Sequence, residues 1–408
     1  MVEAVVAVFV LVYVGMLLGK LPRLELDRTG VALLGAIALI AGGFLSLDQA
    51  ARSIDLSTIT LLFAFMVISA QLRLGGFYTR TAEAVTSLRA SPGMLLAAVI
   101  LLTGVLSAVF MNDIVCLALP PVVIQACRRR GLHPVPFLLA VACAANVGSA
   151  ATLIGNPQNI LIGQSLGLSF SGYLLMAAAP SVLGLLATWV IIAARYRRRW
   201  KNGDEPAGGL PADTPAWNPW QSSKALFITG VLVVVFLFTN LPRDITALGA
   251  AGLLLMSRRM HSRSMLGLVD WQLLVLFCGL FIVNHALALT HVPDLVVTRL
   301  TGLGVDPSHP GWLFVLTALL SDAVSNVPAV MLLLPVAHHP LAGPILALSS
   351  TFAGNLLIVG SIANIIVVES AAAHGIRIGW REHAPTGIAV TAVTLALAAL
   401  TLWIWPLG

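Results

Sequence analysis

Long apolar runs follow one another along almost the whole chain, and they limit the fold more than any other feature. The run "AVVAVFVLVYVGMLL" (Ala4–Leu18) is typical, and charged residues make up only 10% of the 408 positions. A soluble domain carries about 25% charged residues. Because the runs are continuous rather than alternating, they predict an all-α polytopic membrane protein and not a membrane barrel of strands.

The first run has neither a basic segment before it nor a good cleavage site, so we interpret it as a retained helix rather than a signal peptide. The four cysteines, Cys116, Cys127, Cys143 and Cys278, lie in or beside apolar segments without a paired metal spacing. We expect them to pack as small apolar side chains, without a disulfide framework, a metal site or any cofactor.

Ten apolar runs predict ten membrane crossings in two sets of five. The first set lies near 3–19, 29–45, 57–72, 135–166 and 171–194, and the second near 224–239, 244–257, 271–289, 344–374 and 384–405. A doubled segment stands between the third and fourth crossing of each set, at 93–127 and 311–337. Each doubled segment is expected to begin and end on one side of the membrane.

Basic residues give the orientation of these crossings. All but three of the 23 Lys and Arg fall on one predicted side, the exceptions being Arg52, Arg243 and Arg299. The loops are short, so the positive-inside rule places the basic side in the cytoplasm of a bacterial-type inner membrane, with both termini outside. The net charge of +6 is therefore a topology signal and does not indicate nucleic-acid binding.

An internal repeat relates the two sets. "LSAVFMNDIVCLALPP" (Leu106–Pro121) aligns with "LSDAVSNVPAVMLLLP" (Leu320–Pro335), and "LIGNPQNILI" (Leu153–Ile162) aligns with "IVGSIANIIV" (Ile358–Val367). Five crossings is an odd number, so the second repeat is predicted to have inverted topology. We expect one repeat at 1–200, a cytoplasmic linker at 201–221 and the second repeat at 222–408.

Each repeat is predicted to contain two interruptions inside the membrane. Gly311–Val324 and Ala329–Ala337 would form helices of about 21 Å and about 14 Å, too short for a hydrocarbon core of about 30 Å. This doubled segment therefore predicts a re-entrant hairpin, and repeat symmetry assigns the same role to 93–127. The "GNPQN" segment places Pro157 inside a crossing, where it removes a backbone donor, so one crossing per repeat is expected to unwind.

Transporters with inverted repeats bind their substrates where such interruptions meet. Non-helical backbone inside a membrane persists only where it is buried in protein or lines a water-filled cavity. The predicted substrate- and ion-binding residues are therefore the polar residues and glycines of the interruptions: Asn112, Asp113, Asn146, Thr152, Gly155, Asn156, Asn159, Asp322, Ser325, Asn326, Asn355, Gly360, Ser361 and Asn364.

Two carboxylates in this set are candidates for proton coupling. Asp113 either carries a proton, because burial favours the neutral form of a carboxyl group, or caps the second half of its hairpin. Asp322, near the C-terminal end of a half-helix, either binds a proton or sodium ion or makes a structural hydrogen bond.

The signatures "MNDIVCLALPPVV", "NVGSAATLIGNPQNILIG" and "SNVPAVMLLLP" resemble the ion transporter superfamily, most nearly the arsenite efflux permease (ArsB) and its anion-permease relatives. Asn112, Asp113, Asn326 and Pro328 match the arsenite pattern, whereas "GNPQN" is closer to sodium/proton and anion permeases. Sodium-coupled dicarboxylate carriers have Ser-Asn-Thr at both tips. Here the tips read Met111-Asn112-Asp113 and Ser325-Asn326-Val327.

The resemblance implies a secondary transporter that exports arsenite or antimonite in exchange for protons. The alternatives are a sodium- or proton-coupled carrier of a dicarboxylate or inorganic anion, and a sodium/proton antiporter. A channel is less favoured, because a repeat indicates alternating access. The chain has no H-E-x-x-H or G-x-S-x-G motif, so no enzyme is expected. The expected partners are the substrate, the coupling ion and the lipid bilayer. A homodimer and an ATPase subunit are also compatible with this interpretation.

Overall fold

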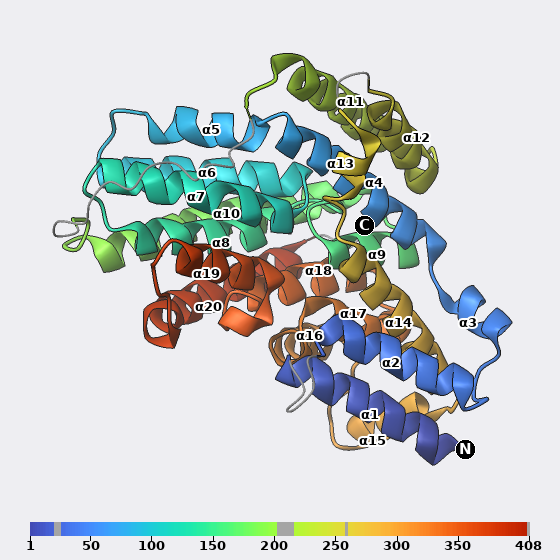
Figure 1. Cartoon of the computed structure of the whole chain (residues 1–408). Coiled ribbons are helices and arrows are strands. Elements are labelled where there is room, and N and C mark those ends of the chain that lie inside the picture. The colour runs from blue at the N-terminus through green and yellow to red at the C-terminus, as the bar shows by residue number, and fades with distance from the viewer. Residues whose placement is uncertain (20–25, 202–215, 258–259, 406–408) are drawn as a thin grey trace.

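The computed structural model describes residues 1–19, 26–201, 216–257 and 260–405. Lys20, Arg23, Arg258 and Arg259 of the basic loops, and residues 202–215 of the predicted linker, lie outside the described residues. The described chain is helical, apart from short connections and one isolated bridge between Leu132 and Lys201. The predicted all-helical class is confirmed (Figure 1).

The first half contains ten helices in the described residues. They are α1 (Val2–Leu18), α2 (Arg28–Ala41), α3 (Leu47–Ser53), α4 (Leu56–Leu74), α5 (Phe77–Thr86), α6 (Pro92–Val109), α7 (Asn112–Arg129), α8 (Pro134–Ser149), α9 (Pro157–Ser165) and α10 (Phe170–Tyr196).

The second half repeats this order, with two short 3₁₀ turns added. Its elements are α11 (Pro219–Phe238), α12 (Arg243–Leu255), α13 (Ser262–Leu266), α14 (Trp271–Ala288), α15 (Val292–Gly302), α16 (Pro310–Val324), α17 (Asn326–Leu333), η1 (Leu334–Val336), α18 (Ala342–Ala353), η2 (Ile358–Gly360), α19 (Ile362–Ala373) and α20 (Trp380–Ile404).

Four connecting helices, α3, α5, α13 and α15, were not predicted. They are short, and none of them is a continuous apolar run that hydropathy would detect. Local capping explains α3, which begins with a capping box formed by Ser46 and Gln49. These helices occupy matching places, since α3 and α13 precede α4 and α14, and α5 and α15 follow them.

The two halves interlock by reciprocal contacts. Helix α2 packs on α14, and α12 packs on α4; likewise α8 packs on α19, and α18 packs on α9. The long last helices of the two halves, α10 and α20, pack on each other. Each half therefore completes the surroundings of the other half's broken segment.

Six helices in the described residues are long and apolar enough to cross a membrane: α4, α6, α10, α11, α14 and α20. Shorter apolar helices, among them α1, α2, α8 and α18, make up the rest. With 15 and 8 residues, α16 and α17 reach about 22 Å and about 12 Å, so neither spans a bilayer core alone. Helix α6, with 18 residues, is long enough to span. The inverted orientation of the two halves stays a prediction.

Helices α8 and α18 form the centre of the molecule. Every residue of both helices is buried, in keeping with sequences that are apolar on all sides. Each of these helices ends in an irregular stretch, residues 150–156 after α8 and residues 354–361 after α18. The first broken segment is almost wholly buried, whereas the second is buried only at its two ends, since residues 356–358 are partly exposed and Val359 is exposed.

Candidate functional site

Both hairpin tips and both broken segments meet at one small cavity. It has a volume of about 20 Å³ and is lined by Asn112, Asp113, Pro157, Gln158, Leu273, Ser325, Asn326, Val327, Ser361 and Ile362. Such a volume holds about one water molecule. Five predicted site residues line it: Asn112, Asp113, Ser325, Asn326 and Ser361.

Asparagine side chains replace the missing helical hydrogen bonds of the first broken segment. Asn156 is the N-cap of α9 in an extended conformation, and its side-chain oxygen accepts a bond from Asn159 N at 2.9 Å. Asn159 Nδ2 in turn donates to the carbonyls of Thr152 (2.8 Å) and Ser149 (3.4 Å). Pro157 at the first position of α9 needs no amide partner, so the unwound turn costs little there.

The second broken segment is held in the same way. Asn364 Nδ2 donates to the carbonyl of Leu357 at 3.1 Å and to that of Gly354 at 2.7 Å. In both halves the accepting carbonyls lie seven and ten residues before the asparagine. The alignment of Asn159 with Asn364 therefore corresponds to an equivalent set of bonds, and both residues have a clear structural role.

Side chains from the two halves also bond directly to each other. Asn146 Nδ2 donates to the side-chain oxygens of Asn355 (3.0 Å) and Asn364 (3.2 Å), and Ser361 Oγ donates to Asn146 Oδ1 (2.9 Å). These four residues are buried. The predicted residues Asn146, Asn355, Ser361 and Asn364 thus form one network that joins α8 to the second broken segment.

Thr351 of α18 does for the first broken segment what Asn146 of α8 does for the second: it bonds to the segment from the opposite half. Its hydroxyl accepts bonds from Gln158 Nε2 at 3.1 Å and from Asn156 Nδ2 at 3.4 Å. Asn156 Nδ2 also donates to Ser149 Oγ at 2.9 Å. Each broken segment is therefore bonded to the central helix of the opposite half.

The second hairpin tip is closed by hydrogen bonds. Ser325 has φ +80°, a conformation rare outside glycine, which turns the chain sharply between α16 and α17. The polar surroundings fix the Asn326 amide with Nδ2 toward Ser321 Oγ (2.6 Å) and the Gly360 carbonyl (3.2 Å). Its oxygen then accepts a bond from Gln158 Nε2 at 3.1 Å.

The first hairpin tip keeps polar atoms without partners. Asn112 donates its backbone amide to the Gly155 carbonyl at 3.0 Å, but its side-chain oxygen has no partner, and neither has the Ser107 hydroxyl. Both atoms are buried. Orphaned buried polar groups are costly, so this tip is the part of the site that is open to a polar ligand.

Gly155 allows the backbones to come this close. A Cβ atom at this position would lie 2.3 Å from the Ser149 carbonyl oxygen and 2.7 Å from that of Ser107. The predicted residue Thr152 also joins this contact, because its hydroxyl donates to the Ala108 carbonyl. Gly155 and Thr152 therefore shape the site from behind and do not line the cavity.

The two candidate carboxylates lie in different surroundings. Asp113 lines the cavity from the first turn of α7, where Met111 occupies the N-cap position without a side-chain capping bond. The alternative that Asp113 caps this helix is therefore wrong. Asp113 is close enough to Asp270, the exposed N-cap of α14, for the two carboxylates to repel each other.

Asp322 lies outside the cavity lining, against the second broken segment. A Cβ atom on Gly360 would lie 3.0 Å from Asp322 Oδ1, and this oxygen has no hydrogen-bond partner. A structural hydrogen bond through Oδ1, the alternative to ion coupling, is thus absent among the described residues.

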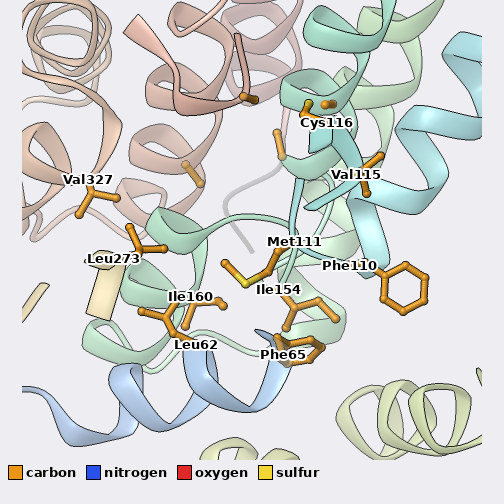
Figure 2. Close-up of a cluster of buried hydrophobic side chains, with 14 of the residues drawn as sticks. Leu62, Phe65, Phe110, Met111, Val115, Cys116, Ile154, Ile160, Leu273 and Val327 are labelled. Carbon is orange, nitrogen blue, oxygen red and sulfur yellow. The ribbon is translucent and has the colours of Figure 1, made fainter. Parts of the chain in front are cut away.

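Apolar side chains enclose the first tip. Figure 2 draws Met111 in one hydrophobic cluster with Ile154 of the first broken segment, Ile160 of α9, Leu62 and Phe65 of α4, and Leu273 and Val327 from the second half. All of these side chains are buried. Asn112 is buried with them, whereas Asp113 next to it is partly exposed.

Several functional residues were missed by sequence reasoning. Gln158 lines the cavity and bonds to both Thr351 and Asn326, and its place inside "GNPQN" was a usable signal. Thr351 ends a run of three hydroxyl residues, Ser349-Ser350-Thr351, in the buried helix α18, and this run was also a usable signal. Ser149 and Ser321 were missed although each lies close to a predicted site residue, Asn146 and Asp322. Tyr173 donates to the Ala150 carbonyl and accepts from Asn159, from a helix that showed no interruption in sequence.

The charge of the lining limits the ligands. Amides, hydroxyls and the Asp113 carboxylate line the cavity, and no Lys, Arg or His is present in its described lining. Cys116 and Cys143 are buried, interact with each other and do not line the cavity. The described residues contain no group of three or more His, Cys, Asp or Glu that could hold a metal ion.

Comparison with known proteins places this geometry in a family. The model of the family described as "Citrate transporter" (CitMHS) matches residues 9–345. The chain belongs to this family. An uncharacterized transporter of Mycobacterium tuberculosis is 31% identical over 410 residues, covering 93% of this chain and 94% of the relative. The predicted membership of the ion transporter and anion permease group is confirmed.

Two further matches extend the comparison. The silicon efflux transporter LSI3 of Oryza sativa subsp. japonica is 28% identical over 429 residues, covering 86% of this chain and 87% of the relative. The crystal structure of the YdaH transporter of Alcanivorax borkumensis has a TM-score of 0.62 at 14% identity, covering 100% and 99% of the two chains. The chain is a multi-pass membrane transporter of the anion-permease type with a known transporter fold.

Proposed function

We propose that this member of the citrate transporter family exports a small uncharged hydroxide, arsenite or antimonite, in exchange for protons. The observation that carries the proposal is the lining of the cavity between the hairpin tips. It offers amides, hydroxyls and one carboxylate, without a cationic side chain in the described lining. Arsenite at neutral pH is a neutral trihydroxide, and such a molecule is bound by hydrogen-bond donors and acceptors rather than by charge.

The first tip supplies the groups that such a substrate needs. The unpartnered oxygens of Asn112 and Ser107 accept hydrogen bonds from substrate hydroxyls, and Asp113 accepts or donates according to its protonation. The cavity of about 20 Å³ is smaller than the substrate. Binding therefore requires the tip to move away from the second broken segment, as expected for alternating access.

Asp113 is the proposed proton carrier. It lines the cavity and is partly exposed, and its acidic neighbour Asp270 lies at the predicted cytoplasmic end of α14. Burial and a like charge both favour the neutral form, whereas exposure to water on one side favours release. Asp322 is a second proton- or sodium-binding group of lesser effect, because it lies outside the cavity lining.

The proposal also covers the membrane in which the protein lies, the direction of transport and the partner subunits. Positive-inside asymmetry supports a bacterial-type inner membrane with external termini. The relative named as a silicon efflux transporter supports an outward direction of transport. A homodimer, and an ATPase subunit for ATP-driven export, remain compatible with this assignment.

Everted membrane vesicles test the proposal, because export then appears as uptake. Vesicles with the wild-type protein are expected to accumulate antimonite and arsenite when a pH gradient is imposed, and to stop when the gradient is collapsed. Vesicles without the protein are the control. Failure to accumulate either metalloid in energised vesicles that contain folded protein would contradict the proposal.

A carboxylate carrier is the second candidate, because the matching family model is described as a citrate transporter. A di- or tricarboxylate would bring its charge next to Asp113, so it would need a co-bound cation or a protonated Asp113. The same vesicles separate the two: uptake of radiolabelled citrate or a dicarboxylate, driven by sodium or protons, favours this candidate. A sodium/proton antiporter would instead show sodium-dependent proton movement without either substrate.

A further inference from the structure

A large basic cavity lies far from the hairpin tips, at the ends of α8, α10, α19 and α20. It has a volume of about 750 Å³ and is formed by three separate stretches of chain, 133–135, 194–199 and 375–382. Six arginines line it: Arg195, Arg197, Arg198, Arg199, Arg377 and Arg381. All of them fall on the predicted cytoplasmic side.

Backbone contacts hold these arginines in place. The chain after α10 returns to α8, where His133 N donates to the Trp200 carbonyl at 2.9 Å and Leu132 bridges to Lys201. Arg128 of α7 donates to the His374 carbonyl at 2.7 Å, which fixes the loop that carries Arg377. These contacts fix the backbone of the segments that carry the arginines, whose side chains are exposed at the cavity.

Its electrostatic character favours anions. Among the described residues of the lining, Glu382 is the single acidic one, and its carboxylate already accepts the amide of Gly379 at the start of α20. None of the six arginines forms an ion pair with an acidic residue within the described chain. The first turn of α20, which begins at Trp380, lies at this cavity and adds the partial positive charge of a helix N-terminus.

The positive-inside rule explains basic residues in these loops but not their arrangement. Topology requires only net charge near the membrane ends, wherever the side chains lie. Here arginines from both halves converge on one cavity, of a size typical for small-molecule sites. Guanidinium groups match phosphate oxygens in bidentate geometry. Trp380, half exposed next to Arg381, is suited to the headgroup level of a bilayer.

We propose that this basic cavity binds a phosphate-bearing anion, and that it clasps the cytoplasmic ends of the two halves together through that anion. Phosphate groups at this position come either from the headgroup of an anionic lipid or from a soluble phosphate compound. The location beside exposed tryptophan favours the lipid headgroup. The proposal concerns a site apart from the hairpin tips and does not depend on which substrate is transported.

Two variants test it in the full-length purified protein. Arg377→Gln/Arg381→Gln removes two charges from the cavity. The matched control, Arg89→Gln/Arg263→Gln, removes two exposed arginines from the same predicted side outside the cavity. Binding is measured by microscale thermophoresis at constant ionic strength. One arm uses cardiolipin in detergent micelles, with phosphatidylcholine as the neutral lipid, and the other uses inorganic pyrophosphate.

We expect cardiolipin to bind the wild type and the control alike, and to bind the cavity variant about tenfold more weakly, since two charge-assisted contacts are lost. The same pattern with pyrophosphate alone would support the site and assign it to a soluble phosphate. Equal weakening in the control and the cavity variant, or no binding of either probe to folded wild type, would overturn the proposal.

Discussion

The two hairpin tips occupy equivalent places in the two halves, yet they differ in how far their polar groups are satisfied. At the second tip, Asn326 bonds to Ser321, Gly360 and Gln158. At the first tip, the side-chain oxygen of Asn112 and the hydroxyl of Ser107 have no partner. Asp113 follows directly, where the second tip has Val327.

The broken segments share part of their bonding. Asn159 and Asn364 donate to carbonyls at the same distances along the chain in both halves. Their side-chain oxygens differ, because Asn364 Oδ1 accepts a bond from Asn146 whereas Asn159 Oδ1 has no partner among the described residues. The amide donors are therefore used alike in the two repeats, whereas the unpartnered amide oxygens of the site, those of Asn112 and Asn159, both lie in the first half. If both tips bound the substrate equally, the amides of Asn112 and Asn326 would be expected to have similar numbers of partners, and they do not.

The largest loss of stability is expected when a methyl group is added at Gly155, which packs against the first tip. In Gly155→Ala the new Cβ meets two backbone oxygens at 2.3 and 2.7 Å, neither of which can move away easily. We expect a loss of at least about 3 kcal/mol and no transport. Gly360→Ala meets only the side chain of Asp322, at 3.0 Å, and should cost less than about 1 kcal/mol. Thermal unfolding in detergent measures both, and equal losses would contradict the difference between the tips.

The second largest loss of stability is expected from the two asparagines of the broken segments, and it should be similar in the two halves. Asn159→Ala and Asn364→Ala each leave two carbonyls without their donor, and we expect about 2–3 kcal/mol of destabilisation from each. The same unfolding assay applies. A difference of more than about 1 kcal/mol between the variants would show that the broken segments are not equivalent.

Replacing the arginines at the starts of α2 and α12 should destabilise the protein less, and by different amounts in the two halves. Arg243 donates to the carbonyls of Leu168 (2.8 Å) and Gly163 (3.2 Å) near the end of α9, whereas Arg28, within the described chain, donates to that of Val359 alone (3.2 Å) in the other half. We expect Arg243→Gln to cost about 2 kcal/mol and Arg28→Gln about 1 kcal/mol. Arg299→Gln, an exposed control, should leave the unfolding temperature unchanged; a reversed order would refute the assignment.

The smallest effect separates the two serines one turn before the tips. Ser321 Oγ bonds to the Ser350 carbonyl at 2.8 Å and to Asn326, so Ser321→Ala should cost about 1 kcal/mol. Ser107→Ala removes a hydroxyl without a partner and should change stability by less than about 0.5 kcal/mol. A raised KM for the transported substrate in Ser107→Ala, at unchanged stability, is the result expected if the first tip binds the substrate.

Much of this arrangement was predictable from the sequence, because it rests on strong local signals. Hydropathy located the crossings, the short half-helices around Ser325 located the second hairpin, and Pro157 among asparagines located the first break. The connecting helices were missed because short helices without a long apolar run have no distinct pattern. The partners of the asparagines, Thr351 and Ser149, were missed because hydroxyl side chains in an otherwise apolar helix can satisfy themselves on the helix backbone, as Ser349 does on the Ile345 carbonyl, so the sequence does not show which of them reaches another element. The positive φ of Ser325 has no sequence signal either, since glycine would be the expected residue.

The central claim is that Asp113 at the first tip couples transport to protons, while the second tip is mainly structural. The most direct test compares Asp113→Asn with Asp322→Asn in everted vesicles, at equal amounts of folded protein, under an imposed pH gradient. We predict that Asp113→Asn loses gradient-driven uptake of antimonite while Asp322→Asn retains a substantial part of it. Wild-type uptake in Asp113→Asn, or equal loss in both variants, would contradict the claim.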